Sequence, residues 1–328
     1  MRTSTPRTTD AVGRPASPVL SVAPLVLPTP DRAVDLEFRV SLPLTATEAP
    51  GNGNRLPVIL LSHGQGHSNN LSSLNGYAPL VALWAAHGFA VIQPTHLSST
   101  TLDLPPETPG APMHWRSRAG DMARLIDRFD EIEAAVPGLA GRLDRERIAV
   151  AGHSMGAHTA GLLLGASLTD PDDGTEVELA DPRIKAGVVL AGPGRGGDAI
   201  TPPMAEALPF LTTTDFSRMA TPTLVVRGEK DESGHLTVMG PDWHADPYTL
   251  APGPKTLLTL FEAEHGLGGI SGYDVAETTD ENPARVAALA HLTSAYLRGV
   301  LYADDAAWRT AVEAHASGPD AFGRVESK

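Results

Sequence analysis

The unit that most constrains the fold is a short apolar run, residues 147–151, that leads straight into Gly-His-Ser-Met-Gly at 152–156. The run has the character of a buried strand, and the small-residue segment 157–168 is typical of a helix that packs closely on a sheet. Glycines two places on either side of Ser154 permit a sharp turn between the two, because they leave room for a strained central residue. We therefore expect a sheet that contains this strand and a helix that packs over it.

Further strand and helix signals alternate on both sides of this unit. Apolar runs typical of strands lie at 57–61, 89–93, 184–190, 222–227 and 256–261. Apolar residues spaced by three or four positions, as on one face of a helix, recur over 74–87, 116–136 and 283–299. Repeated strand-then-helix order predicts an α/β protein with a mainly parallel central sheet and helices on both faces.

The two ends of the chain differ from this central part. Segment 19–27 is apolar but contains Pro24, which is typical of an extended segment at a sheet edge. Segment 34–41 alternates apolar and polar residues, like a half-buried antiparallel strand. We expect a disordered or extended leader, one catalytic domain, and a C-terminal helix and tail, at 1–30, 31–303 and 304–328.

Composition excludes several classes of protein. No apolar run approaches the roughly 18 residues of a membrane span, and the formal net charge of −14 repels phosphate backbones and anionic lipid surfaces. The absence of cysteine excludes disulfides, thiolate metal sites and a cysteine nucleophile. No apolar stretch of a secretory signal follows the first residues. We expect a soluble, cytoplasmic protein with no nucleic-acid partner and no membrane span.

Chemistry at Ser154 requires two partner residues. A serine hydroxyl attacks only when a base takes its proton and a third group, usually a carboxylate, orients that base. Asp231 follows the strand at 222–227, and His265 follows the strand at 256–261, so both belong at the carboxyl edge of a parallel sheet. We predict that Ser154 is the nucleophile, His265 the general base and Asp231 the acid.

Three other carboxylates are alternatives to Asp231 as the acid. Glu229 and Glu232 lie in the same turn, and Asp198 follows the preceding strand. The turn at 227–231 favours Asp231, because it places that residue at the carboxyl end of its strand.

Four linked features resemble the α/β-hydrolase superfamily, over roughly residues 34–300. They are Ser-His-Gly-Gln-Gly at 62–66, the turn around Ser154, the turn at 228–231 and Glu-His-Gly at 264–266. The small single-domain branch with chlorophyllases, dienelactone hydrolases, platelet-activating-factor acetylhydrolases and cutinase-like polyesterases is similar. The resemblance implies an α/β-hydrolase fold with no large separate cap domain.

The resemblance also implies an oxyanion hole. In that branch the loop after the strand that ends at Ser62 supplies one backbone N–H group, which by its motif is that of Gln65 here, and Met155 supplies the other. Substrates do not carry over from two of the relatives. Dienelactone hydrolases use a cysteine, and secreted polyesterases have an export signal and usually a disulfide, neither of which is expected here.

Twelve histidines raise the question of a metal site. Neither His63 with His67 nor His153 with His158 has the spacing of a zinc-binding helix with a glutamate between the histidines. The glycine-rich run at 192–197 lacks the ending of a phosphate-binding loop and the spacing of a dinucleotide site. We predict no metal and no cofactor.

Segments 192–220 and 232–254 are rich in Gly, Pro, Thr and Asp and are longer than typical connections, so they are candidates for binding loops or a small lid. The second includes His244, a candidate wall residue of a pocket. Candidate substrate-binding residues, each of which could instead pack or bond within the loops, are His67, His153, His235 and Trp243.

The predicted activity is hydrolysis of a carboxylic ester, with a small to medium hydrophobic or polyester-like substrate and an acyl-enzyme on Ser154. The same residues could act on an amide, a carbamate or a lactone, since they define the machinery and not the leaving group. A non-catalytic binding protein on the same fold is the alternative from another class. We expect a small-molecule ester as partner, and a monomer or homodimer.

Overall fold

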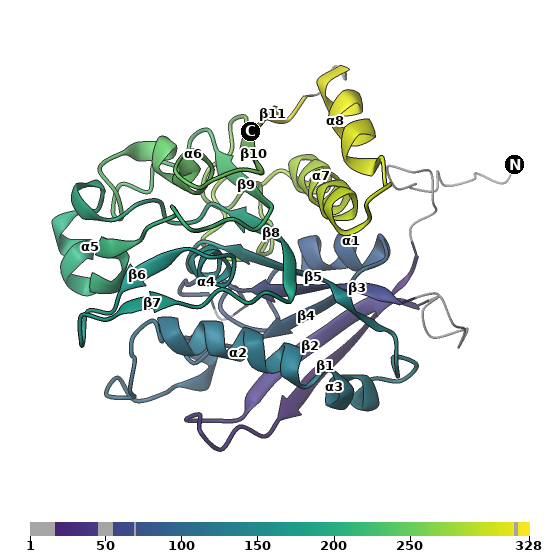
Figure 1. Ribbon diagram of the computed structural model, residues 1–328, viewed down its shortest axis with the longest axis horizontal. Helices are drawn as coiled ribbons and strands as arrows, with labels where there is room; N and C mark the ends of the chain where they lie inside the picture. The colour runs from purple at the N-terminus through teal and green to yellow at the C-terminus, as the bar shows by residue number, and fades with distance from the viewer. Residues whose placement is uncertain (1–16, 45–54, 69, 318–320) are drawn as a thin grey trace, which may run out of the picture.

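The computed structural model describes residues 17–44, 55–68, 70–317 and 321–328. A nine-stranded sheet runs through these residues (Figure 1). Its spatial order is β1 (Val19–Leu27), β2 (Leu36–Pro43), β4 (Ala90–Pro94), β3 (Leu56–Ser62), β5 (Leu143–His153), β8 (Ile184–Leu190), β9 (Thr223–Gly228), β10 (Lys255–Leu260) and β11 (Gly323–Ser327).

The six inner strands from β4 to β10 are parallel, and the three outer strands join antiparallel. Every residue of β3 is buried, as is expected when both faces of a parallel strand are covered. Side chains alternate between the faces, so Leu60 packs in one apolar core while Ile59 and Leu61 pack in the other. The predicted fold class is therefore confirmed.

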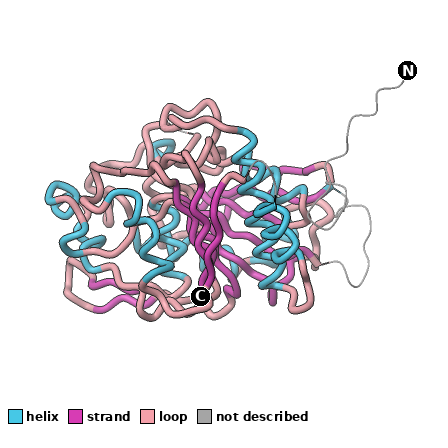
Figure 2. The backbone as a smooth tube through the Cα atoms, turned by 90° about the horizontal axis from the view of Figure 1, so that it is seen from above, coloured by secondary structure: helices cyan, strands magenta, loops and turns pink. Residues whose placement is uncertain are grey.

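Helices cover the two faces in separate layers, which Figure 2 shows with the sheet between them. One face packs against α1 (Ala78–Ala86), α7 (Pro283–Leu301) and α8 (Ala307–Ser317). The other packs against α2 (Trp115–Asp127), α3 (Phe129–Ala135) and α4 (Met155–Leu163). The inner strands such as β3 therefore bury both faces, and the loops at the carboxyl edge are left to form a site.

The C-terminal segment differs from the expectation of a helix and tail beyond residue 304. Helix α8 is present, but Gly323–Ser327 form strand β11, which pairs with β10 through contacts such as Val325 opposite Leu258. An unpaired β10 would expose a row of backbone N–H and C=O groups, and β11 satisfies them. A side chain at Gly323 would clash with the Thr259 carbonyl, so the strands approach closely only because this residue is glycine. Residues Gly323–Ser327 thus belong to the central sheet.

At the other end, β1 is the edge strand of the sheet, as the apolar segment with Pro24 predicted. The register shifts between Val22 and Leu25, around the proline that lacks a ladder donor. Residues 17–30 of the expected leader are therefore ordered, and the strand belongs with the domain. Residues 1–16 of that leader lie outside the described residues.

Three predicted helices were too long. The pattern at 74–87 yields a helix only from Ala78, because Tyr77 at its N-cap has a left-handed backbone with φ 64°. The pattern at 116–136 is divided at Arg128 into α2 and α3. The segment 157–168 leaves the helix after residue 163, because Gly165 has φ 110° and turns the chain into β6 (Ser167–Thr169), which pairs with β7 (Glu176–Glu178).

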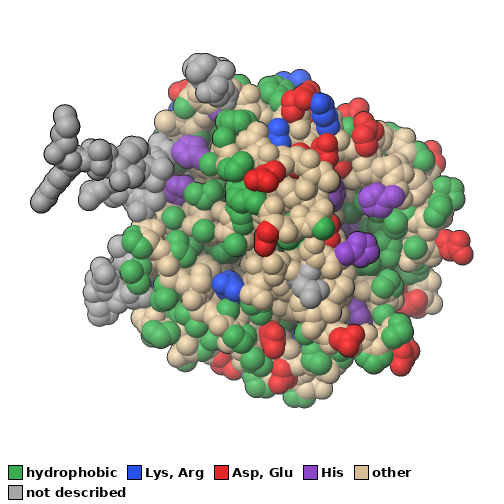
Figure 3. Space-filling view, turned by 180° about the vertical axis from the view of Figure 1, so that it is seen from behind, with side chains coloured by type: hydrophobic (Ala, Val, Ile, Leu, Met, Phe, Trp, Pro, Cys, Tyr) green, Lys and Arg blue, Asp and Glu red, His purple; other side chains and the backbone are tan. Residues whose placement is uncertain are grey.

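No helix among the described residues is long and apolar enough to cross a membrane. Acidic side chains are spread over the face of the molecule shown in Figure 3, in keeping with the formal net charge of −14.

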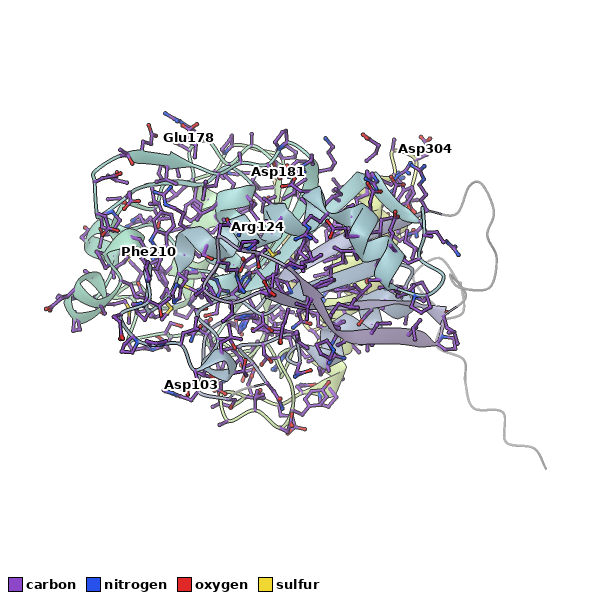
Figure 4. All side chains as sticks on the ribbon, turned by 90° about the horizontal axis from the view of Figure 1, so that it is seen from below. Asp103, Arg124, Glu178, Asp181, Phe210 and Asp304 are labelled. Atoms are coloured by element: carbon purple, nitrogen blue, oxygen red, sulfur yellow. The ribbon has the colours of Figure 1, made fainter. Side chains whose placement is uncertain are left out.

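The long segment 192–220 forms an insert of short elements that packs beside α4. It contains 3-10 helix η3 (Gly197–Ala199), helix α5 (Pro202–Ala207) and 3-10 helix η4 (Pro209–Thr213). Figure 4 shows Phe210 of this insert at the same end of the molecule as Glu178 of β7, opposite Asp304. Phe210 packs in an apolar cluster with Met155, the first residue of α4. The insert thus borders the strand-to-helix turn.

A buried hydrogen bond joins α1 to α7 and yields the first prediction. Trp84 Nε1 donates to Thr293 Oγ1 over 2.9 Å, and both side chains are fully buried. The substitution Thr293→Val keeps the shape but leaves the indole N–H without an acceptor, so we expect the free energy of unfolding to fall by about 1–3 kcal/mol. Urea denaturation measures it. The control is Ser294→Ala, which removes a buried hydroxyl with no partner among the described residues; an equal loss in both variants would contradict the prediction.

Candidate active site

The turn at Ser154 has the strain that its sequence predicted. Ser154 lies between β5 and α4 with φ 54° and ψ −121°, a backbone region that residues with side chains rarely adopt. A Cβ at Gly152 would clash with the Gly156 backbone, and one at Gly156 would clash with the Ser62 carbonyl. Both glycines are therefore required by close backbone packing. The Ser154 N–H donates to Leu190 O over 3.0 Å, which ties the turn to β8.

Asp231 and His265 come together at the carboxyl ends of β9 and β10. His265 Nδ1 donates to Asp231 Oδ2 over 2.8 Å, because a carboxylate oxygen only accepts. The Asp231 side chain is 1% exposed, while that of His265 is 36% exposed. The proton on Nδ1 leaves Nε2 as the basic nitrogen of His265, as a general base requires.

Two further groups surround the Asp231 carboxylate. Ser233 Oγ donates to Asp231 Oδ1 over 2.6 Å, and His244 Nε2 lies 3.3 Å from Oδ2. Burial tends to raise the pKa of Asp231, but its contacts with His244 and His265 outweigh burial and hold the pKa well below the usual range. Asp231 is therefore ionised at neutral pH.

The alternative acids lie elsewhere. Glu229, Glu232 and Asp198 are exposed, and the carboxylate that meets the His265 ring among the described residues is that of Asp231. Glu229 instead accepts the backbone N–H of Glu262.

A chain of hydrogen bonds connects the loop after β3, the Ser154 turn and the His265 loop. His153 Nε2 lies 2.8 Å from His265 O, which only accepts, so Nε2 carries a proton. Burial lowers the pKa of His153 to about 3, so the ring is neutral and its Nδ1 accepts from Tyr77 OH over 2.9 Å. The Tyr77 oxygen in turn accepts the Gly64 N–H over 2.9 Å. Each ring nitrogen of His153 and the hydroxyl group of Tyr77 thus has a hydrogen-bond partner in this series.

These hydrogen bonds give His153 a structural role, the connection of Tyr77 to the His265 loop, in place of the predicted contact with substrate. Both its ring nitrogens are occupied by protein groups, and the side chain is buried. Tyr77 is the residue that sequence reasoning missed. It lies 76 positions from His153 in the chain, and no local motif marks it.

The loop after β3 holds its two glycine N–H groups in side-chain bonds. Gly64 donates to Tyr77, and Gly66 donates to Ser72 Oγ over 3.0 Å. The Gln65 backbone lies between them, and its side chain donates to Ser98 O over 2.9 Å. Across the turn, Met155 is the first residue of α4, where backbone N–H groups have no acceptor within the helix.

A buried arginine donates hydrogen bonds to this loop and to two neighbouring segments. Arg118 is fully buried and donates to the His63 carbonyl, to Ser98 Oγ over 2.7 Å and to Thr159 Oγ1 over 3.0 Å. Burial lowers the pKa of Arg118 only to about 10, so it stays charged. His63 donates from Nδ1 to Gly64 O and accepts the His96 N–H at Nε2. The ring nitrogens of His63 are thus both engaged with the protein.

The remaining predicted contact residues are not brought to one place. His67 and His235 are exposed. Trp243 is fully buried, and its Nε1 donates to Arg195 O over 2.9 Å. Trp243 therefore anchors the loop at 192–197 from the inside, which corrects its predicted contact with substrate.

One cluster of three potential metal ligands exists among the described residues: Asp231, His244 and His265. His265 Nδ1 and Asp231 Oδ2 are separated by 2.8 Å, which is an ordinary hydrogen-bond length. This contact is the hydrogen bond that His265 Nδ1 donates to Asp231.

Comparison with known proteins agrees with the fold. The Alpha/beta hydrolase family model matches residues 58–326, and no curated protein matches the chain. Because the match extends over most of its length, the chain belongs to the α/β-hydrolase family. The match identifies the family as a whole and no branch of it, and it supports hydrolase activity in general.

The hydrogen-bonded chain through Tyr77 yields a prediction. Tyr77→Phe removes the donor to His153 and the acceptor of the Gly64 N–H, so two buried groups lose their partner. We expect the free energy of unfolding to fall by about 1–3 kcal/mol, measured by urea denaturation. Tyr296→Phe, at another buried tyrosine on α7, is the control. If the Tyr77 variant were as stable as the wild type, the hydrogen-bond chain would be wrong.

His158, one turn after Ser154, yields a prediction about pH. Its ring packs against Phe210, neither nitrogen has a partner among the described residues, and burial lowers its pKa from 6.5 to about 3. Between these values the unfolded chain binds a proton that the folded chain does not, so stability falls as the pH falls from 6.5 to 3.

The substitution His158→Met removes this proton uptake and replaces the imidazole with an apolar side chain of similar length. We expect the slope of unfolding free energy against pH to decrease by about 1.4 kcal/mol per pH unit over that interval. Urea denaturation at several pH values measures the slope. An unchanged slope would mean that His158 takes up its proton in the folded protein.

Proposed function

We propose that this chain is a serine esterase that cleaves a carboxylic ester through an acyl-enzyme on Ser154. The observation that carries the proposal is the 2.8 Å bond from His265 Nδ1 to a buried, ionised Asp231, in a protein whose serine lies in a strained strand-to-helix turn. Strain of this kind persists where the surrounding structure enforces it, and it is concentrated at functional sites.

In the proposed reaction Ser154 Oγ attacks the ester carbonyl while His265 Nε2 takes its proton. Asp231 holds the ring and stabilises the imidazolium, and the N–H groups of Gln65 and Met155 bind the oxyanion. The proton on Nε2 then passes to the departing alcohol, which leaves an acyl group on Ser154. Water adds to this acyl group, His265 accepts the proton of the water, and the acid is released as Ser154 recovers its hydrogen.

The oxyanion donors are supported by the bonding of their neighbours. The Gly64 and Gly66 N–H groups are engaged by Tyr77 and Ser72, which holds the backbone of Gln65 between them. Donors held in advance cost no reorganisation when the charge develops, and each is worth about 3–4 kcal/mol in comparable sites.

The surroundings of Met155 support an uncharged, hydrophobic substrate. Met155 packs in an apolar cluster with Phe210 and Trp243. Half-buried apolar side chains that pack against this cluster include Met113, Trp115, Met204 and Leu236. Flexible methionines adapt to ligands of different shape, and the formal charge of −14 disfavours anions. A small to medium hydrophobic ester fits these surroundings.

The proposal is tested with p-nitrophenyl esters of increasing acyl length. Ser154→Ala removes the nucleophile, so we expect kcat/KM to fall at least about 1000-fold with the fold intact by circular dichroism. Ser217→Ala, at an exposed serine, is the matched control and should retain full activity. A fluorophosphonate probe should label the wild type and not the Ser154 variant.

Equal rates in the wild type and the Ser154 variant would refute the nucleophile. Labelling without ester turnover would instead favour the amide, carbamate or lactone alternatives, and a panel of such substrates separates them. A folded protein that neither turns over esters nor takes up the probe would favour the alternative of a non-catalytic binding protein.

A further inference from the structure

A polar cavity of about 110 Å³ lies between helix α1 and the strands at one edge of the sheet (Figure 1). Its polar lining comes from β1, β2, β4 and the segment before α1, and it consists of Ser21, Arg39, Ser41, Asn75 and Gln93. Strand β3 lies between these strands and β5, the strand that ends at the Ser154 turn. The cavity is therefore a separate place in the fold from the candidate active site.

Strand pairing places the polar side chains of this cavity next to one another. Arg39 on β2 lies opposite Gln93 on β4, and Ser41 on β2 lies opposite Ser21 on β1. Arg39 and Ser41 are two positions apart, so their side chains point to the same face of the sheet. Gln93 and Ser41 are each 1% exposed, whereas Ser21 and Asn75 are exposed. The cavity thus has a buried floor and is open to solvent at its rim.

The amide of Gln93 leaves one hydrogen-bond acceptor unpaired at the floor of the cavity. Its Nε2 donates to Ser73 O over 2.9 Å and to Gly76 O over 3.0 Å. Carbonyl oxygens only accept, so these two bonds fix which end of the amide is the nitrogen. Oε1 is buried and has no partner among the described residues. A buried acceptor without a donor is unfavourable, so the site favours a ligand that supplies an O–H or N–H group.

The guanidinium of Arg39 brings a positive charge to the same cavity. Its Nε donates to Leu74 O over 2.9 Å, and its Nη2 donates to Asn75 Oδ1 over 2.6 Å. Both acceptors are neutral, and no carboxylate among the described residues forms an ion pair with Arg39. The side chain is half-buried, and burial lowers its pKa, as happens to a charge that loses hydration without a counter-ion.

The start of α1 adds to this positive potential. Ala78, the first residue of α1, also lines the cavity. The N-terminal end of a helix carries a partial positive charge, which favours an anion nearby. The cavity therefore attracts an anion locally, in a protein whose formal net charge is −14.

We propose that this cavity binds a small hydroxycarboxylate, independently of the proposed function at Ser154. The carboxylate accepts hydrogen bonds from the Arg39 guanidinium, and the hydroxyl group donates to Gln93 Oε1. The volume sets the size of the ligand. A cavity of about 150 Å³ holds benzene, so about 110 Å³ has room for about five non-hydrogen atoms, the number in glycolate.

Ordered water is the alternative occupant of the cavity. A water molecule would donate to Gln93 Oε1 but would leave the charge of Arg39 without a counter-ion. A simple anion such as acetate has the opposite defect, because it would pair with Arg39 but has no hydrogen to donate to Gln93. Only a ligand that combines both groups satisfies both side chains.

Titration of the 15N-labelled full chain with sodium glycolate tests the proposal by nuclear magnetic resonance. We expect the side-chain amide signal of Gln93 and the backbone signals of residues 39–41 to shift with a Kd of about 1 mM, within the range open to a ligand of about five atoms. Acetate at the same ionic strength should bind at least about threefold more weakly, because it leaves Gln93 Oε1 unpaired. Equal binding of the two anions would overturn the assigned contact with Gln93.

A pair of arginine variants tests the contact with the carboxylate. Arg39→Met keeps a long side chain and removes the charge, so we expect glycolate to bind at least about tenfold more weakly. Arg309→Met removes the same charge from an exposed position on α8 and should bind glycolate as the wild type does.

Two results would overturn the proposal and leave water as the occupant. One is the absence of shifts in the wild type at glycolate concentrations well above the expected Kd, and the other is an unchanged affinity in the Arg39 variant. The comparison of glycolate with acetate uses the wild-type chain, so it remains decisive even if the Arg39 variant does not fold.

Discussion

The contact between the Ser154 turn and the end of β3 is the constraint on which the site depends. Gly156 lies so close to the Ser62 carbonyl that no side chain fits, and Gly152 lies equally close to the backbone of Gly156. Because β3 and β5 are neighbours in the sheet, this packing brings the loop after β3 beside the first turn of α4. This close backbone packing holds Ser154 beside the loop after β3, independently of any side-chain contact.

Buried histidines then connect the loops around this contact, and hydrogen-bond logic assigns their protons. His153 joins Tyr77 to the His265 carbonyl, and His63 joins Gly64 to His96. These rings are neutral, because burial depresses their pKa values and each has one acceptor and one donor to satisfy. A neutral imidazole suits such places because it donates on one side and accepts on the other without a charge to desolvate.

The sequence predicted the sheet better than the helices. Apolar runs located the parallel strands within a few residues, since a strand covered on both faces must be apolar along its length. Helix limits depended on features that periodicity does not record, such as the left-handed backbone at Tyr77 and the break at Arg128. Strand β11 was missed because its five residues carry no strong apolar pattern. They form a strand by pairing with the edge of β10, which has no other partner on that side among the described residues.

For the site, the sequence by itself determined the turn at Ser154 and the meeting of Asp231 with His265. Glycines dictate the turn locally, and residues that directly follow neighbouring parallel strands must emerge at one edge of the sheet. Only the tertiary structure decided that Tyr77 bonds to His153 and that His244 stands against Asp231. Those contacts join segments far apart in the chain, and the burial that makes each bond matter does not exist until the fold has closed around it.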